Sequence, residues 1–469
     1  MTPELYSEVT ILMKLNNGKK LAYHTANANI LTNIRTKLKF IFFSLFGVMA
    51  FFYSFEFRGN DTFLVEHLSI YIRETFQAYI PFVALFIAFI AISEIIQRKP
   101  KCVGSPSSIV LSVIKILGFT GLIMGVFNIG PGILMDPDVI PFVLGQIISS
   151  ITVTILVAAL VLPFILDYGL VDFVGILMQS IMRPLFKTPG SSAMIAVTAF
   201  LGNFSVGHIA INQMFTEGKL TSKEAAIMGT SFCTASIPFL LVIADIIQIM
   251  DYWVLYFWSA VLITLLTSLV VVRLWPLSSK NDYYYESATP QPEPTIKTNI
   301  FKNAVLTGLK TAEQAEPLQN RLWALMKEST VILSSIVVGA MFFGTLGILI
   351  EQYTNFITYV GYIFLLPLQL INIPDVGVIA NAAAVSVLEI TLPAIIGIQS
   401  EAALAARFVI ALIPVSAIVF LAGFVPSIIS TKIPVTIPEL IVLWLERTFI
   451  TVILGSILAL ILSLQRNIG

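Results

Sequence analysis

The chain has 469 residues and contains the same succession of five apolar elements twice, at 139–276 and again at 327–464. In each block a long apolar run is followed by a shorter amphipathic segment, by a run that polar residues break in its middle, and by two more long runs. A polar linker at 277–326 separates the two blocks. A repeated unit of this kind is typical of membrane transporters, whose folds are often built from internal repeats.

The composition places this repeated unit in a lipid bilayer. Hydrophobic residues make up 57% of the chain and charged residues only 12%, which is far too apolar for a soluble protein of this length. Several uncharged runs exceed the ~18 residues that a helix needs to cross hydrocarbon roughly 30 Å thick. These runs lack the alternation of membrane-spanning strands. The sequence therefore predicts an all-α polytopic membrane protein.

A scaffold of three helices is expected at 38–138, ahead of the first block. It follows a mixed segment at 1–37, which does not resemble a secretory signal because its first apolar run begins too late. The predicted full-length spanning helices are 38–55, 78–97, 108–127, 141–166, 224–248, 252–275, 331–350, 402–425 and 438–464.

Basic residues orient these helices, because lysine and arginine in short loops stay on the cytoplasmic side. They precede the first helix, recur after the second and occur in the linker, whereas the loop after the third helix carries Asp136 and Asp138 without a basic residue. We therefore expect the N-terminus and the linker in the cytoplasm. Because the linker is polar and rich in proline, we expect a flexible tether that ends in an interfacial helix near Trp323; a regulatory site is the alternative.

The run in each block that polar residues break is predicted to be a re-entrant helical hairpin, at 192–215 and at 376–398. The first has Asn203 and Ser205 at its centre, and the second has Glu389. Polar groups that face hydrocarbon cost several kcal/mol each, so such a centre is tolerated only where protein or a wet cavity surrounds it.

Each predicted hairpin follows an amphipathic segment, at 168–186 and at 354–370, which we expect to lie along a membrane interface. With the first segment on the inner interface, Arg183 and Lys187 stay inside. By the same symmetry, the second lies on the outer interface, and one block is upside down relative to the other. Such an inverted repeat places a binding site near the middle of the membrane.

Charged and ionisable residues inside these runs are the first candidates for a site. Glu389 is the strongest candidate for binding solute or a coupling ion, because a lone acid near the middle of a bilayer is costly and usually functional. The alternative is a buried ion pair with Arg407 or Arg447. His208 could carry a coupling proton, and the alternative is that it satisfies a hairpin carbonyl.

Small hydroxyl side chains form the second group of candidates, in the helices that follow the two hairpins. Thr230, Ser231 and Thr234 precede Pro238 in the first of these helices. Ser416 follows a second central proline in the other. We expect each proline to kink its helix beside the site. The alternative for the hydroxyls is that they cap carbonyls of their own helix or aid helix packing.

No enzymatic motif is present in the sequence. There is no phosphate loop, HExxH, GxSxG or paired metal motif, so we expect neither an enzyme nor a cofactor nor a metal centre. Cys102 and Cys233 are the only cysteines, which predicts no disulfide framework.

The segments 183–190, 205–207, 216–219 and 223–226 carry a resemblance that runs on through 231–236. In these residues the chain resembles the YjiH family of bacterial membrane proteins, which contain the nucleoside-recognition Gate domain. Gate domains resemble the membrane parts of concentrative nucleoside transporters and of ferrous-iron permeases. The resemblance implies the fold of the nucleoside transporters, with its two hairpins, two interfacial helices and inverted repeat, and a place in the bacterial inner membrane.

The resemblance also implies where solute binds. In the nucleoside transporters the two hairpin tips and the two broken helices hold the substrate. The matching positions of this chain are Asn203, Ser205, Thr230, Ser231, Thr234, Glu389, Thr391 and Ser416. The expected coupling-ion residues are Glu389, His208 and Asn212.

From these observations we expect a secondary transporter of a small polar metabolite such as a nucleoside, which works by alternating access. Proton or sodium coupling is expected because the chain contains no ATP-binding element. Membrane lipid and further copies of the chain are the expected neighbours, and nucleic acid is not. The alternatives are a membrane scaffold or partner protein that keeps the fold without moving solute, and a divalent-metal permease.

Overall fold

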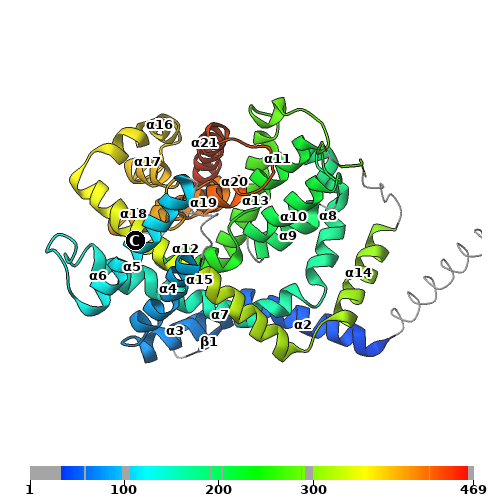
Figure 1. The fold of residues 1–469 in the computed structure, drawn as a ribbon, viewed down its shortest axis with the longest axis horizontal. Coiled ribbons are helices and arrows are strands. Elements are labelled where there is room, and N and C mark those ends of the chain that lie inside the picture. Colours follow the sequence, from blue (N-terminus) through cyan, green and yellow to red (C-terminus); the bar gives the residue numbers. More distant parts are fainter. Residues whose placement is uncertain are drawn as a thin grey trace, which may run out of the picture.

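The structure, a computed structural model, describes residues 33–57, 60–97, 106–190, 192–201, 204–286, 288–290, 299–421 and 423–462. Nearly all regular structure in these ranges is helical, which confirms the predicted all-α class (Figure 1). The exception is one antiparallel pair of short strands, β1 (Ser54–Phe57) and β2 (Asn60–Phe63).

Ahead of the first block lie the helices α2 (Ile34–Phe52), α3 (Leu64–Phe76), α4 (Ile80–Gln97) and α5 (Pro106–Phe127). Helix α2 begins earlier than predicted, because the side chain of Asn33 accepts hydrogen bonds from the backbone N–H groups of Arg35 and Thr36. The sequence-based prediction missed α3. This short helix bends by 107° into α4 and packs along the first long helix of the first block.

The first block contains α6 (Ile140–Phe142), η2 (Val143–Ile148), α7 (Ser149–Leu166), α8 (Leu170–Phe186), α9 (Ser192–Leu201), α10 (Phe204–Thr216), α11 (Ser222–Ser231), α12 (Ile237–Ile246), η3 (Met250–Tyr252) and α13 (Trp253–Val271). A single turn, η4 (Leu277–Ser279), follows it. The second block contains α15 (Leu318–Tyr353), α16 (Phe356–Ile371), α17 (Val376–Val385), α18 (Leu392–Gln399), α19 (Leu404–Ala417), α20 (Phe424–Ile429) and α21 (Ile437–Ile461).

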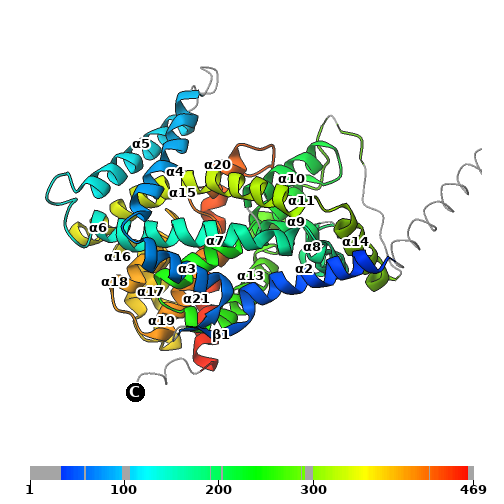
Figure 2. The ribbon, with the colours of Figure 1, turned by 90° about the horizontal axis from the view of Figure 1, so that it is seen from below.

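The two blocks therefore show one order of elements: a long helix, a shorter helix, a pair of short helices, a broken helix and a last long helix. We call α9 with α10 the first helix pair and α17 with α18 the second helix pair. The two pairs lie in opposite halves of the molecule in both views (Figures 1 and 2). The long helices α7 and α15 run side by side from one half of the molecule toward the other (Figure 2).

Four helices of the described chain are long and apolar enough to cross a membrane. They are Ile140–Leu166, Met250–Val271, Leu318–Ile350 and Ile437–Ile461, which open and close the two blocks. A fifth span is formed if the bent pair of α3 and α4 counts as one. The protein is therefore a multi-pass membrane protein, as the composition predicts.

The prediction of continuous helices at 224–248 and 402–425 was wrong, because both are broken rather than kinked. In the first, α11 ends at Ser231, and Pro238 stands in the first turn of a new helix, where its missing N–H is not needed. In the second, Pro414 stays inside α19. Here Ile418 ends the helix with a φ of 63°, a left-handed conformation that a helix cannot continue.

The linker contains a helix that the sequence-based prediction did not include. Its second half forms α14 (Ile300–Gln314), which packs on α8 and α2. The approach is close: a Cβ atom on Gly169 would lie 2.0 Å from the carbonyl oxygen of Gly308. Thr311 donates a hydrogen bond of 2.7 Å to Asp172 across the same contact. Trp323 is not on a separate interfacial helix but exposed within α15.

Candidate functional site

The ends of the two broken helices meet the last helix of each block in a buried polar cluster. Ser268 of α13 donates a hydrogen bond of 3.1 Å to the carbonyl oxygen of Ser231, the last residue of α11. Arg447 of α21 donates one of 2.8 Å from Nε to the carbonyl oxygen of Ser416, in the last turn of α19. Each last helix thus supplies a donor to a carbonyl that its own broken helix leaves without a continuing turn.

The two halves of this cluster are joined to each other. Arg447 Nη1 donates to Ser268 Oγ at 3.3 Å, and Thr451 Oγ1 donates to Ser416 Oγ at 2.8 Å. We call Ser231, Ser268, Ser416, Arg447 and Thr451 the central polar cluster; each has a relative exposure of 0%. The cluster brings both blocks together where both helices break.

Several buried polar atoms in and beside the cluster have no hydrogen-bond partner among the described residues. They are Arg447 Nη2, Ser231 Oγ, Thr234 Oγ1 and Thr448 Oγ1. Leaving such a group unsatisfied costs on the order of 1–3 kcal/mol, more for a charged one. Buried donors without partners therefore mark this region as a place where a ligand or water can bind.

The sequence-predicted hydroxyls divide into two kinds. Thr230 Oγ1 donates to the carbonyl oxygen of Ala226 in its own helix, at 2.7 Å, which is the hydrogen bond that the alternative role of these hydroxyls predicts. Ser231, Thr234 and Ser416 lie at the helix breaks as predicted. Arg447 is not among the solute-binding residues predicted from the sequence. The signal that could have found it is an arginine, next to Glu446, in the middle of an apolar run.

Glu389 lies in the connection between α17 and α18 with 4% of its surface exposed. Its Oε2 accepts hydrogen bonds from the backbone N–H of Thr391, at 2.5 Å, and from the Thr391 hydroxyl. The carboxylate therefore caps the start of α18, where a negative charge is favoured. Within the described chain it forms no ion pair with Arg407 or Arg447, so that alternative was wrong.

The connection of the second helix pair is tied to the second break. The backbone N–H of Leu421 donates to the carbonyl oxygen of Val387 at 2.7 Å. Trp444 of α21 donates from Nε1 to Ser386 Oγ at 2.8 Å. Glu389 thus sits on a segment whose position is fixed by the broken helix and by the helix that carries Arg447.

His208 plays the matching part in the first helix pair. Its Nε2 lies 3.1 Å from the carbonyl oxygen of Gly229 in α11, and its Nδ1 lies 2.8 Å from Ser427 Oγ in α20. A carbonyl only accepts, so Nε2 carries a proton and Nδ1 accepts from Ser427 in the neutral ring. Asn212 accepts from the backbone N–H of Lys432 at 2.7 Å. The first helix pair is therefore bound to the broken helices of both blocks.

Each helix pair packs against the second half of the broken helix in the other block, α10 against α20 and α18 against α12. Gly397 makes one of these contacts close, since a Cβ atom there would lie 2.8 Å from Ile247 Cδ1. Asn203 lies outside the described residues, and of Ser205 only the backbone, in α10, is described.

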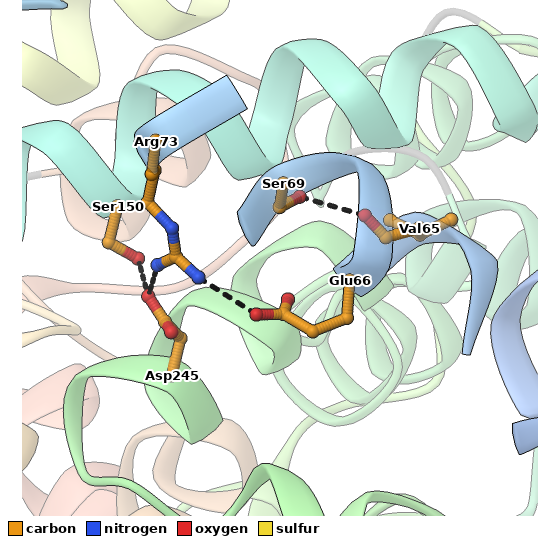
Figure 3. A network of polar contacts seen from close by, with 6 residues as sticks. All are labelled: Val65, Glu66, Ser69, Arg73, Ser150 and Asp245. Carbon is orange, nitrogen blue, oxygen red and sulfur yellow. Dashed lines mark hydrogen bonds and ion pairs between the residues drawn. The ribbon is translucent and has the colours of Figure 1, made fainter. Parts of the chain in front are cut away.

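A separate charged network joins the scaffold to the first block (Figure 3). Arg73 of α3 forms ion pairs with Glu66, at 2.8 Å, and with Asp245 of α12. Ser150 of α7 also donates to Asp245. The arginine is held between two acids, so its charge is compensated, in contrast to that of Arg447. We interpret this network as an attachment of α3 to α7 and α12.

The described residues contain no group of three or more His, Cys, Asp or Glu side chains that could hold a metal ion. The polar contacts within the central polar cluster come from hydroxyls, backbone carbonyls and one guanidinium group.

Comparison with known proteins identifies a domain within this architecture. Residues 110–250 match the Gate family model, described as nucleoside recognition. An uncharacterized protein of Alkalihalophilus pseudofirmus is 29% identical over 432 residues, which cover 88% of this chain and 92% of that protein. The matched Gate segment contains α7 to α12, and thus the first helix pair and the first break.

Among solved structures, CNTnw in an inward-facing substrate-bound state is similar, with a TM-score of 0.40, 12% identity, and coverage of 89% of this chain and 98% of that chain. A CNTnw variant in an outward-facing state is similar with a TM-score of 0.39 and 14% identity, and the match covers 92% of this chain and 100% of that chain. The Gate domain that the resemblance implied is confirmed, whereas the YjiH name stays a prediction. The chain is a multi-pass membrane protein whose residues 110–250 match the Gate, or nucleoside recognition, family model.

Proposed function

We propose that this protein is a secondary transporter that carries a small polar metabolite, with nucleosides as the first candidates, across the bacterial inner membrane by alternating access. The observation that carries the proposal is the central polar cluster, which places buried donors without partners where both broken helices end. Such atoms are costly in a closed core and are satisfied when a polar solute binds beside them. The nucleoside assignment rests on the description of the Gate domain.

In the proposed mechanism, the two helix pairs are re-entrant hairpins in an inverted repeat, and the N-terminus and linker are cytoplasmic. The solute binds among Asn203, Ser205, Thr230, Ser231, Thr234, Glu389, Thr391 and Ser416, with Arg447 added from the structure. Because the cluster is fully buried, solute reaches it only when the hairpin-bearing elements move against the scaffold.

Coupling to protons or sodium is assigned to Glu389, His208 and Asn212. His208 can accept a proton without losing either neighbour, because the Gly229 carbonyl keeps its donor and the Ser427 hydroxyl can turn from donor to acceptor. The charge of the ring would then depend on which side of the membrane the first helix pair faces.

The experiment that tests the function is uptake by the purified full chain in liposomes. Labelled uridine, amino acids, polyamines and carboxylates are offered with an imposed proton or sodium gradient, and protein-free liposomes are the control. We expect accumulation of one solute class that depends on one of the gradients. Absence of uptake in every combination would favour the alternative of a membrane scaffold or partner protein.

A further inference from the structure

Arg447 is a buried positive charge that attracts its chain neighbour Glu446 but forms no ion pair within the described residues. It has 0% exposure, and Nε and Nη1 donate to the Ser416 carbonyl oxygen and to Ser268 Oγ, which are both neutral acceptors. Nη2 has no partner within the described residues, and Arg447 takes part in none of the ion pairs found there. Glu446, its neighbour in the chain, also leaves Oε2 without a partner. A guanidinium group in this position is costly unless an anion joins it.

The first break offers further donors. Ser231 is joined to Arg447 through Ser268, and its hydroxyl is free, as is that of Thr234 three residues later. The next helix, α12, is ten residues long, and its N-cap Ser236 makes no side-chain hydrogen bond to the helix. In its first turn Pro238 has no N–H and the Phe239 N–H donates to the Ser236 carbonyl, which leaves the Ile237 N–H, on an end of the helix that favours negative charge.

We propose that the solute carries an acidic group, a carboxylate or a phosphate, and that Arg447 binds it through Nη2 together with the hydroxyls of Ser231 and Thr234. This inference rests on the proposed transport function and names its substrate class. A guanidinium N–H suits both acids, because its charge-assisted hydrogen bond to a carboxylate or phosphate oxygen is stronger than one to a neutral acceptor. The solute supplies the acceptor that the described residues do not offer to Nη2.

A different role for Arg447 would be purely structural, as a bridge between the carbonyl ends of α11 and α19. That role uses Nε and Nη1 and leaves Nη2 idle. It also leaves the hydroxyls of Ser231 and Thr234 idle, so removing one of them would not change binding of any solute.

Binding to the full chain in detergent separates the two roles. Uridine, uridine monophosphate, succinate and inorganic phosphate are titrated by calorimetry against the unmodified protein and two variants, Arg447→Lys and Thr234→Val. We expect the acidic probes to bind, with affinity at least about tenfold weaker in Arg447→Lys and about three- to tenfold weaker in Thr234→Val. The phosphate and succinate arms distinguish which acid is preferred.

Thr154→Val is the matched control. The Thr154 hydroxyl in α7 is also fully buried without a partner, but α7 contributes no residue to the central polar cluster. We expect it to leave every affinity unchanged. If Arg447→Lys does not fold, Thr234→Val still decides, because it replaces an unpartnered hydroxyl by a methyl group of similar size.

If uridine binds and the acidic probes do not, the proposal of an acidic solute is wrong, while the transport proposal stands. The same conclusion follows if Thr234→Val and Thr154→Val bind the acidic probes with equal affinity. Failure of all four probes to bind the folded protein would also overturn it. Binding of an acid without uptake by liposomes would refute transport and retain the anion site. The two proposals therefore fail separately.

Discussion

The two breaks that face each other across the central polar cluster are built from opposite chemistry. The first, between α11 and α12, has the sequence Phe232-Cys-Thr-Ala-Ser236 and contains its own hydroxyl groups. The second, between α19 and α20, has the sequence Ile418-Val-Phe-Leu-Ala-Gly423 and contains no polar side chain. A polar break can offer its own hydroxyl groups to a ligand as hydrogen-bond partners. An apolar break has no polar side chain, so its hydrogen-bond donors come from another helix. Arg447 and Thr451 of α21 meet that need.

The largest expected effect follows from removing the donor on which the apolar break depends. In Arg447→Leu the Ser416 carbonyl loses the hydrogen bond from Nε, which we expect to lower the free energy of unfolding by about 1–3 kcal/mol and to abolish uptake. Ser268→Ala removes the equivalent donor from the first break, and there we expect a loss of about 1 kcal/mol. Thermal unfolding in detergent measures both, and equal losses would contradict the comparison.

The second helix pair differs from the first in using a carboxylate. Glu389→Gln keeps an oxygen that can accept from the Thr391 N–H but removes the charge. If Glu389 binds solute or a coupling ion, we expect uptake to fall at least about tenfold, while the unfolding midpoint changes little. Thr391→Val removes one donor to the same oxygen and keeps the charge, so it separates the effect of the hydrogen bond from that of the charge. Unchanged uptake in Glu389→Gln would mean that Glu389 only stabilises the start of α18 and binds neither solute nor a coupling ion.

The first helix pair uses an imidazole in the matching place. His208→Gln can retain a hydrogen bond to the Gly229 carbonyl but cannot hold an extra proton. We expect uptake to persist with its dependence on a proton gradient lost, and stability to fall by about 1 kcal/mol because the contact with Ser427 changes. Ser427→Ala is the control, which removes that contact and keeps the imidazole. Uptake that still follows the proton gradient in His208→Gln would contradict the coupling role.

The order of elements could be read from the sequence because long apolar runs and their polar interruptions are local features. Hydropathy located α7, α13, α15 and α21, the helices long enough to cross a membrane. It did not reveal the break after α19, where Ile418 adopts a φ of 63° inside an uninterrupted apolar run. The backbone conformation there depends on contacts with α21 and the second helix pair, which no local pattern encodes.

The missed helix α3 has a related cause. It is short and carries charges, so between two apolar runs it resembles a loop. Its Arg73 is satisfied by Asp245, 172 positions later in the chain, and that pairing makes the helix compatible with a buried position. The hydrogen bonds of Arg447 could not be predicted for the same reason, because its partners lie on α13 and α19. The sequence predicts which polar and charged residues lie in apolar surroundings, but it does not predict which of them form hydrogen bonds or ion pairs with one another.

The smallest expected effect concerns the caps of the helices that flank the breaks. Thr221 of α11 and Thr436 of α21 each form a capping box, in which the side chains of the cap and of the glutamate three residues later serve the first turn. Ser236, which begins α12, makes no such bond. We expect Thr221→Ala and Thr436→Ala to lower stability by about 1 kcal/mol each, and Ser236→Ala by only a few tenths.

Unfolding midpoints of the three alanine variants, measured in the same detergent without added solute, check this order. A loss in Ser236→Ala as large as in Thr221→Ala would mean that the serine already caps α12, and that the first turn of this helix is not free. A small loss would mean that no side chain serves this helix end, where the backbone carbonyl of Ser236 accepts from the Phe239 N–H and the Ile237 N–H still needs an acceptor. In that case, uridine monophosphate should raise the midpoint of Ser236→Ala as much as that of the unmodified chain.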